Sequence, residues 1–345
     1  MSTTAAVIGV SSPVGRATLA RLTAAGGPGR VVAIDPDSPD MPDGRIEIRH
    51  MDARDRLLAL ALDGVDVLVH CAFEDDPATS PDSLYGANVG GTRNVLAAAD
   101  GAGVQHLVVI SDAMAYGAHH DNALPLTETM PLRANPGFAY GYQRQLVEEL
   151  VEQWAVEHPE RVVTRLRTAP VMGEGVDSAL ARRLQAPRLV VPLGQDAPWQ
   201  FVHVDDVAAA VALVVEQRLG GVFNVAADGW LSSSEVATYL GRRVLEVPQA
   251  TLEQVLRRAG DLGLAPLPAE AMPYLMHPWV LDNDALRGHG WHAGRSNRDL
   301  LAAFAAAHAD DLALGRVVFS RRGVRRTLAA AGALVTLAVW RLIRR

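Results

Sequence analysis

The sequence predicts an α/β fold with a doubly wound parallel sheet. Hydrophobic residues make up 49% of the 345 residues, which is enough for a sizeable buried core. Short apolar runs of strand length alternate with stretches of helical periodicity, as in "AAVIGV", "VVAID", "VDVLVHCA", "HLVVIS" and "RVVTRLR". Because such alternation is typical of strand–helix–strand units, we expect a parallel sheet that is covered by helices on both faces.

The same pattern divides the chain into two lobes and a tail. We expect a nucleotide-binding domain over 1–170 plus 201–229, since a strand–helix–strand pattern returns at "FVHVDDVAAAVALVVE" and "GVFNVAA". The loop-rich, proline-spaced segments 171–200 plus 230–305 predict a smaller C-terminal substrate lobe. Residues 306–345 are an appended C-terminal tail.

A glycine-containing turn follows the first predicted strand, in "AAVIGVSSPVGRATLARL". Gly9 permits a tight turn, and Gly15 lets the next helix pack close to the strand. Ser12 stands between them, where a glycine would let backbone and phosphate approach most closely. The amide groups at this helix start, with Val14 among them, would face a pyrophosphate. Taken alone, an ordinary strand–helix turn explains these residues equally well.

Acidic residues after the next two strands strengthen the nucleotide interpretation. Asp35 lies 20 residues after Gly15, where a carboxylate accepts hydrogen bonds from a ribose 2′-hydroxyl group. An acid there would repel the 2′-phosphate of NADP, so NAD is the expected cofactor. Asp52 and Ala53 follow the third strand and are placed near the adenine. The alternative for Asp52 is a solvated helix N-cap.

Composition narrows the classes of partner and compartment. The net charge of −7 gives no support for nucleic-acid binding. All 32 basic residues are arginine. Cys71 is the single cysteine, which excludes an internal disulfide and fits a reducing, cytoplasmic compartment. The start "MSTTAAVIGV" has no charged region before an apolar run and does not resemble a secretion signal.

A later helix carries a candidate catalytic pair. In "AYGYQRQLVEEL" the apolar residues recur at helical spacing, so Tyr140 and Arg144 lie on one face, one turn apart. From spacing alone, this pair is either a proton-transfer unit or a structural hydrogen bond.

Several ordered motifs resemble those of the extended short-chain dehydrogenase/reductase family, also called the NAD-dependent epimerase/dehydratase family. The resemblance covers residues 5–305 and implies a Rossmann-type fold. Its motifs are "VDVLVHCAF", "NVGGTRNVLAAA" (88–99), "SDAMAYG" (111–117), "LRTAPVMG" (166–173), "FVHVDDVA" (201–208) and the "GW" to "DLL" stretch (290–301). Motifs of this kind specify the fold better than the activity.

The resemblance implies a catalytic set of Ser or Thr, Tyr and Lys that works with a bound NAD. Tyr140 stands at the tyrosine position, Arg144 at the lysine position and Asp112 at the hydroxyl position. Ser111 is adjacent to Asp112, and successive strand residues point to opposite faces, so we expect Ser111 to face away from the tyrosine. The resemblance also places Cys71, Ala72 and Ser111 beside the cofactor.

Two of these positions depart from the family pattern. Arg144 keeps a positive charge but replaces a compact ammonium by a planar fork. Asp112 cannot donate to a substrate carbonyl while it is ionised, and its charge raises the pKa of a nearby tyrosine. One hypothesis is a direct Asp112–Arg144 ion pair, with charged atoms within about 4 Å. The other makes Asp112 the general base, helped by Tyr140.

Two functions follow from this altered set. The first is an NAD-dependent oxidoreductase or epimerase that acts on a secondary alcohol, a ketone or a sugar nucleotide. The alternative is a non-catalytic NAD(P)-binding sensor or accessory protein. No metal site is expected, because His203, Asp205 and Asp206 open a helix, where acids complement the helix dipole. Arg167 either touches substrate or caps the sheet edge.

The tail differs from the rest of the chain in charge. Residues 316–345 contain eight arginines and no acid. These arginines lie on both sides of a 14-residue apolar run, Thr327–Trp340. A helix of that length spans about 21 Å, less than a hydrocarbon core of about 30 Å. We expect this helical segment to contact a membrane surface, or to pack on a partner or on a second copy in a homodimer.

Overall fold

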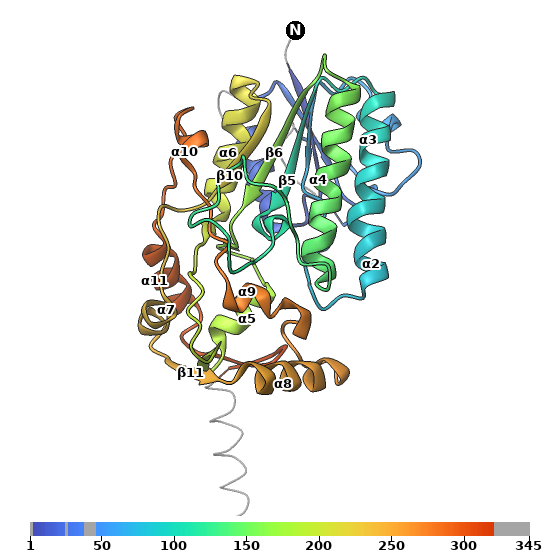
Figure 1. The fold of residues 1–345 in the computed structure, drawn as a ribbon. Coiled ribbons are helices and arrows are strands. Elements are labelled where there is room, and N and C mark those ends of the chain that lie inside the picture. Colours follow the sequence, from blue (N-terminus) through green and yellow to red (C-terminus); the bar gives the residue numbers. More distant parts are fainter. Residues whose placement is uncertain (1–2, 25–26, 38–45, 321–345) are drawn as a thin grey trace, which may run out of the picture.

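The computed structural model describes residues 3–24, 27–37 and 46–320. A seven-stranded sheet forms the centre of the larger lobe, with the strand order β10-β6-β5-β4-β1-β2-β3 (Figure 1). Every pairing in this sheet is parallel. The strands are β1 (Thr4–Ile8), β2 (Arg30–Ile34), β3 (Ile46–Arg49), β4 (Val67–His70), β5 (His106–Asp112), β6 (Val162–Thr168) and β10 (Gly221–Val225). The predicted doubly wound α/β fold is confirmed.

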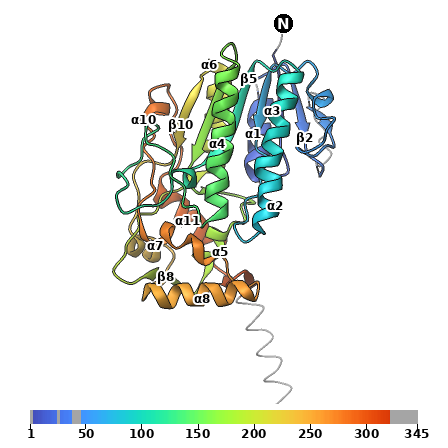
Figure 2. The same ribbon diagram turned by 45° about the vertical axis from the view of Figure 1, so that its right-hand side comes forward.

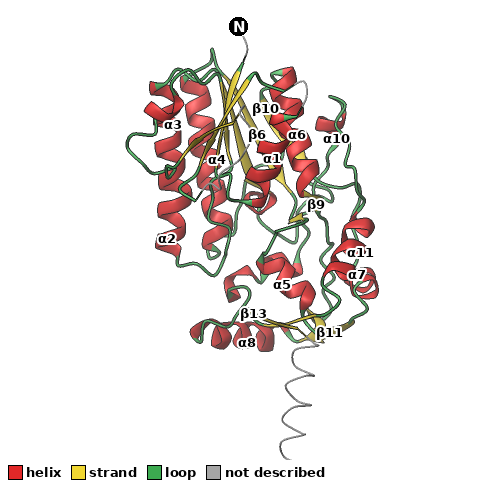
Figure 3. Ribbon diagram, turned by 180° about the vertical axis from the view of Figure 1, so that it is seen from behind, coloured by secondary structure: helices red, strands yellow, loops and turns green. Residues whose placement is uncertain are grey.

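Helices cover both faces of this sheet. α1 (Pro13–Thr23) and α6 (Val204–Gln217) pack together on one face, which is turned to the viewer in Figure 3. α3 (Gly91–Gly101) and α4 (Ala139–Glu157) cover the other face, which is in front in Figure 2. α2 (Pro81–Tyr85) runs through a π-helical turn (Gly86–Gly90) into α3. Short 3-10 turns lie at Leu60–Leu62, Ala113–Tyr116 and Ala269–Ala271.

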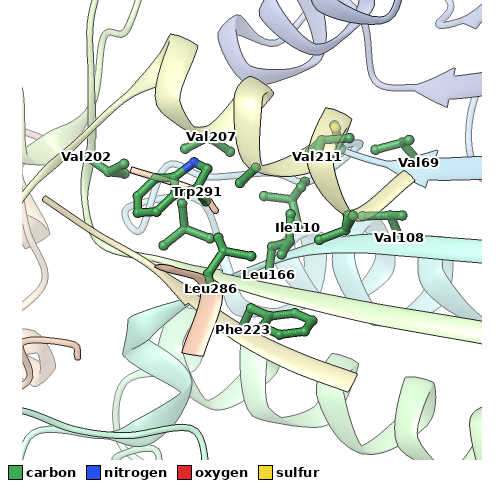
Figure 4. Close-up of a cluster of buried hydrophobic side chains, with 14 of the residues drawn as sticks. Val69, Val108, Ile110, Leu166, Val202, Val207, Val211, Phe223, Leu286 and Trp291 are labelled. Carbon is green, nitrogen blue, oxygen red and sulfur yellow. The ribbon is translucent and has the colours of Figure 1, made fainter. Parts of the chain in front are cut away.

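The strand residues alternate between two hydrophobic cores. Val7 and Ala33 point toward α1 and α6, whereas Ile8 and Ile34 point toward α3 and α4. Figure 4 shows the first core, where Val108, Ile110 and Leu166 of the sheet meet Val207 and Val211 of α6, with Leu286 and Trp291 from the C-terminal part of the chain beside them. A strand buried on both faces reads as a continuous apolar run, which is why the sequence shows such runs.

The smaller lobe lies below the carboxyl edge of the sheet in Figure 1. Its elements are α5 (Ala179–Gln185), β8 (Arg188–Pro192), α7 (Ser233–Tyr239), β11 (Arg243–Val247), α8 (Gln249–Asp261), α9 (Pro273–Met276), α11 (Asn297–Ala307), β12 (Asp311–Leu314) and β13 (Val317–Ser320). The short helix α10 (Asp284–Arg287) lies instead beside β10 of the large sheet. β8 pairs with β11, β12 with β13, and the short β7 (Val171–Met172) with β9 (Val202–His203). A separate core that includes Trp199, Phe201 and Leu300 holds the lobe together.

The sheet topology fixes where a ligand would bind. β1 has β2 on one side and β4 on the other, so the chain winds outward in opposite directions from this point. Ligands of doubly wound sheets bind at the carboxyl ends of the strands beside such a switch point. Gly9 follows β1, Cys71 follows β4 and Asp112 ends β5, so all three lie at this edge.

Only the first residues of the predicted tail belong to the described chain. α11 ends at Ala307, and a β-hairpin follows over 311–320. The apolar run Thr327–Trp340 lies outside the described residues, so its contact with a membrane or a partner stays a prediction. Within 3–24, 27–37 and 46–320, no helix has the length and apolar character needed to cross a bilayer.

Candidate active site

Tyr140, Arg144 and Asp112 meet at the carboxyl edge of the sheet. Tyr140 lies in the first turn of α4 and donates its hydroxyl hydrogen bond to Asp112 Oδ2 at 3.0 Å. Arg144, one turn further along α4, donates from Nη2 to the Tyr140 hydroxyl oxygen at 3.1 Å. The hydroxyl group therefore lies between a carboxylate and a guanidinium, and the three side chains form one hydrogen-bonded chain.

The direct ion pair that we expected between Asp112 and Arg144 is wrong. In the described part of the chain, no carboxylate oxygen of Asp112 comes within 4.0 Å of a guanidinium nitrogen of Arg144. The physical reason is that the Tyr140 hydroxyl group occupies the space between them and bonds to both. The two charges are coupled through this hydroxyl group, so Tyr140 remains part of the polar unit.

Burial changes the proton affinities of this unit. The pKa of Tyr140 is raised well above its usual value by burial, and the Asp112 charge raises it further, while Arg144 opposes the shift. Burial also raises the pKa of Asp112, with the Arg144 charge opposing the shift. Tyr140 is therefore neutral at physiological pH, and Asp112 is a stronger base than an exposed carboxylate.

Asp112 has a second, local role. Its Oδ1 accepts the backbone N–H of Met114 at 2.8 Å and so caps the 3-10 turn that follows β5. The neighbouring Ser111 hydroxyl group is buried without a hydrogen-bond partner, so it forms no hydrogen bond with Tyr140. Because successive residues of a strand point to opposite faces, Asp112, and not Ser111, bonds to the tyrosine.

Arg144 is held in place from both sides. Its guanidinium carbon lies 4.3 Å from the centre of the Phe73 ring and 5.0 Å from the centre of the Tyr140 ring. Its Nε is buried and has no partner. A buried donor without a partner is costly, so this atom marks a place where a bound polar group would be stabilised. A ribose hydroxyl group is the chemistry that fits.

The glycine turn has the close backbone approach that a dinucleotide site needs, but few of its N–H groups are free to bind a phosphate. Gly9 has φ +91°, and a Cβ there would lie 2.5 Å from the backbone nitrogen of Ala72. A Cβ on Gly15 would overlap the carbonyl oxygen of Gly9. Ser12, however, caps α1 by accepting the Gly15 N–H at 3.0 Å, and it donates to the Gly9 carbonyl at 2.8 Å. Since Pro13 has no N–H, the amide of Val14 is the donor left in this first turn for a phosphate.

The Asp35 carboxylate is buried and largely engaged. Its Oδ2 accepts the backbone N–H of Ser11 at 3.0 Å and the Ser11 hydroxyl at 2.7 Å, and its Oδ1 accepts the backbone N–H of Asp37 at 3.0 Å. A carboxylate offers about four acceptor positions, so roughly one remains for a ribose hydroxyl group. Asp52 instead pairs with Arg54 at 2.8 Å, and the hydrogen bond from Arg54 lowers the Asp52 pKa.

A cavity of about 220 Å³ joins the glycine turn to the C-terminal lobe and passes Tyr140 on the way. Of the residues singled out from the sequence, the cavity is lined by Ser12, Val14, Cys71, Ser111, Asp112, Tyr140 and Arg144. The remaining ones lie away from the lining: Gly9, Gly15, Asp35, Asp52, Ala53 and Ala72. Cys71 is an inert part of this wall, because burial raises its pKa to about 12.

Several lining residues were missed by the sequence analysis. Phe73 is the last residue of the "VDVLVHCAF" motif, so its nearness to the site could have been inferred from its position. Arg183, Trp199 and Tyr274 belong to the C-terminal lobe, where no motif with a known mechanism marks them. They reach the cavity through the packing of distant segments.

Arg167 and His203 both make structural contacts. Arg167 is buried and donates to both carboxylate oxygens of Glu148, at 2.8 and 2.9 Å, and to the Tyr116 hydroxyl at 2.7 Å. It is a structural residue beneath α4 and does not line the cavity. His203 is the N-cap of α6, its Nδ1 accepting a backbone N–H. Within the described ranges, no cluster of three or more potential ligands could hold a metal ion.

Known proteins resemble this chain in sequence over more than half of its length. Residues 5–226 match the NAD dependent epimerase/dehydratase family. An uncharacterized protein of Mycobacterium tuberculosis is 30% identical over 271 residues, which are 75% of this chain and 71% of the relative. An N-acetyl-alpha-D-glucosaminyl-diphospho-ditrans,octacis-undecaprenol 4-epimerase of Escherichia coli is 37% identical over 130 residues, 37% of each chain.

Solved structures with the same fold cover most of the chain. A dTDP-glucose 4,6-dehydratase from Streptomyces venezuelae, solved with NAD bound, has a TM-score of 0.70 at 21% identity and covers 89% of this chain and 97% of its own. A UDP-glucose 4-epimerase from Thermus thermophilus in complex with NAD has a TM-score of 0.68 at 20% identity, covering 88% and 98%. At this identity the likeness shows the fold alone.

Proposed function

Because the chain belongs to the NAD dependent epimerase/dehydratase family, we propose that it is an NAD-dependent oxidoreductase or epimerase with an altered catalytic set. Its substrate is a secondary alcohol or ketone, the class to which the sugar nucleotides named for its structural neighbours also belong. The observation that carries the proposal is the Tyr140 hydroxyl group held between Asp112 and Arg144 in the wall of a cavity that begins at the glycine turn.

The residues of the glycine turn and of α4 would hold the cofactor. The Val14 amide would face the pyrophosphate. The free acceptor position of Asp35 would accept a hydrogen bond from a ribose hydroxyl, and the unpartnered Arg144 Nε would donate to the second ribose. The charge of Asp35 supports NAD over NADP. When bound, NAD accepts or returns a hydride at the reacting carbon.

Asp112 is the proton acceptor in this proposal. Oxidation of a secondary alcohol would also require removal of its hydroxyl proton, and this chain's own residues would have to accept it. Tyr140 is a poor base because its pKa is raised, whereas the raised pKa of Asp112 brings a carboxylate closer to the proton affinity that this step needs. Tyr140 then positions Asp112 and the substrate oxygen, and Arg144 holds Tyr140 by its hydrogen bond.

One observation favours a second candidate, a non-catalytic NAD(P)-binding sensor or accessory protein. The hydroxyl proton of Tyr140 points at Asp112, so in this arrangement it is not available to a substrate carbonyl. A protein that binds the cofactor without turning over a substrate would tolerate this arrangement.

The test compares cofactor binding and turnover in matched variants. NAD, NADH and NADP are titrated by calorimetry into the wild type, Asp112→Asn, and the double variant Asp112→Ser/Arg144→Lys. NADH formation is then followed at 340 nm with a panel of secondary alcohols, and epimerisation of UDP-glucose, which leaves no net NADH, is followed by NMR. Asp63→Asn serves as the control, because it removes an exposed acid outside the cavity lining.

The outcomes separate the two candidates. The oxidoreductase proposal expects NAD to bind more tightly than NADP, with turnover in the wild type and Asp63→Asn and a loss of at least about 100-fold in Asp112→Asn. Binding of NAD with turnover in the double variant alone would support the sensor. If the wild type binds no nicotinamide cofactor, both candidates are refuted.

A further inference from the structure

The C-terminal lobe contributes an apolar half to the cavity. Its walls there include Leu180, Trp199, Phe201, Leu267, Leu275 and Trp279. These side chains come from three separate segments that pack against one another beneath the catalytic chain of hydrogen bonds. A ligand that fills this half would bury apolar surface, which favours binding.

Most polar side chains that the described lobe brings to this half already have partners inside the protein. The Gln200 amide nitrogen donates to the carbonyl oxygens of Ala227, Gly229 and Leu281 at 3.0, 3.1 and 3.0 Å, and its oxygen accepts the Leu281 N–H at 2.7 Å. The Ser233 hydroxyl accepts the indole N–H of Trp199 at 2.9 Å.

The same holds at the other polar positions of this wall. The Ser178 hydroxyl caps α5 by accepting a backbone N–H at 3.1 Å. The Tyr274 hydroxyl donates to the Met114 carbonyl at 2.8 Å, and the Trp279 indole donates to a backbone carbonyl at 3.0 Å. A ligand rich in hydroxyl groups would therefore meet few side chains with spare hydrogen-bonding capacity in this half.

Arg183 differs from these residues because only part of its hydrogen-bonding capacity is used within the protein. Its guanidinium carbon lies 4.3 Å from the centre of the Trp199 ring, and Nη2 donates to the Val190 carbonyl at 3.0 Å. In the part of the chain that the structure describes, no carboxylate oxygen lies within 4.0 Å of this guanidinium. Arg183 lines the cavity, and an arginine has five N–H donors, so most of its donors remain for a ligand.

We propose that the cavity takes an apolar substrate with a single oxyanion group, a carboxylate or a phosphate, that pairs with Arg183. The apolar body lies against Trp199 and Leu267, and the reacting alcohol or ketone carbon faces Tyr140. The planar guanidinium matches both oxyanions in geometry, and its stacking on Trp199 fixes its orientation. This inference rests on the proposed oxidoreductase function and narrows its substrate class.

The charge around Arg183 supports the choice of an anion at that end of the cavity. Asp75 and Asp112 also line the cavity, but both interact with Arg144, and neither acts on Arg183. A cation in an apolar wall without a neutralising acid is destabilised, and burial lowers the pKa of Arg183 to about 9. An oxyanion from the ligand would supply the missing counter-charge. The hydroxyl groups of a sugar nucleotide would instead have to leave water for a wall with few free partners, which carries a desolvation cost for each unpaired group.

The experiment measures binding to the full-length protein by calorimetry, with no turnover required. The probes are octanoate, octyl phosphate, uncharged octan-1-ol and UDP-glucose. They are titrated into the wild type, Arg183→Met, and the matched control Arg188→Met, which removes an exposed arginine of the same lobe. NAD is titrated in parallel. Circular dichroism confirms that each variant is folded.

The proposal expects octanoate or octyl phosphate to bind the wild type more tightly than octan-1-ol. Arg183→Met should weaken binding of the anionic probe roughly 10- to 100-fold, with little change for octan-1-ol, while Arg188→Met leaves both affinities unchanged. The difference between octanoate and octyl phosphate identifies the oxyanion. If Arg183→Met does not fold, the comparison of octanoate with octan-1-ol on the wild type still decides.

Two results would overturn the inference. One is binding of octan-1-ol as tight as that of both anions, and the other is saturable binding of UDP-glucose where neither anion binds. Failure of the proposed function looks different, because it would appear as no binding of NAD by the wild type whatever the octyl probes do.

Discussion

Replacement of Asp112 by asparagine should release the hydroxyl proton of Tyr140. Asp112 uses both oxygens, Oδ1 for the Met114 N–H and Oδ2 for the Tyr140 hydroxyl. An asparagine can keep its carbonyl oxygen on the Met114 side, which places its NH₂ group against Tyr140. Since an NH₂ group only donates, the Tyr140 proton must turn away from residue 112 and toward the cavity.

The same substitution should lower the pKa of Tyr140. The Asp112 charge raises this pKa in the wild type, and Arg144 remains in place in the variant. One charge at about 4 Å contributes roughly 4 kcal/mol at an effective dielectric constant near 20, which corresponds to about three pKa units. Because the cavity admits water, which screens the charge, we expect a decrease of about one to three units.

The assay is a pH titration by NMR of protein labelled with ¹³Cζ-tyrosine. The resonance of Tyr140 is assigned as the one missing from Tyr140→Phe, and Asp52→Asn controls for the loss of an acid elsewhere. The wild-type resonance should not titrate up to about pH 11, while the variant resonance should begin to do so. An identical Tyr140 titration in wild type and Asp112→Asn, or a tyrosinate at neutral pH in the wild type, would refute the reasoning.

Three further predictions test residues that support the site: Gly9, Arg167 and His70. Gly9→Ala should lower the free energy of unfolding in urea by about 1–3 kcal/mol and abolish NAD binding, because its Cβ would meet backbone at 2.5 Å, whereas Gly64→Ala, also at positive φ but with nothing within 4 Å, should keep NAD binding. Equal NAD binding by both variants would contradict the close-contact argument. Arg167→Met should destabilise by roughly 1–3 kcal/mol, because the buried Glu148 charge would keep only Arg165, 3.6 Å away, as an ion-pair partner. Arg167→Met/Glu148→Leu should recover part of that loss in the same denaturation experiment, and no recovery would speak against a buried ion pair. Burial lowers the pKa of His70 to about 3, so the unfolded chain binds its proton first, and the free energy of unfolding should decrease as the pH falls from about 6.5 toward 3. His70→Asn should show a shallower pH dependence, and an unchanged slope would argue against this assignment.

Local sequence signals predicted the sheet but not the contacts within the site. Apolar runs such as "VVAID" report burial on both faces, and that property depends on a few adjacent residues. The family motifs placed Asp112 and Tyr140 in one site although 28 positions separate them. The motifs could not show that the Tyr140 hydroxyl group would lie between Asp112 and Arg144, because that depends on the reach and rotamers of three side chains.

The substrate half of the cavity was beyond sequence reasoning for a different reason. Arg183 and Trp199 stack in the structure, yet they are 16 positions apart in a segment without a repeat period or a motif. Their partners across the cavity, among them Leu267 and Tyr274, come from a part of the chain more than sixty residues further on. Only tertiary packing brings these segments together, and no spacing rule encodes it.

The hydrogen bonds of Gln200 have a consequence for how this lobe moves. One amide side chain ties together the segments around Ala227, Gly229 and Leu281. None of these segments can swing outward alone without breaking a bond to the same buried group, and a buried amide left unpaired is costly. The floor of the cavity should therefore open as one cooperative unit.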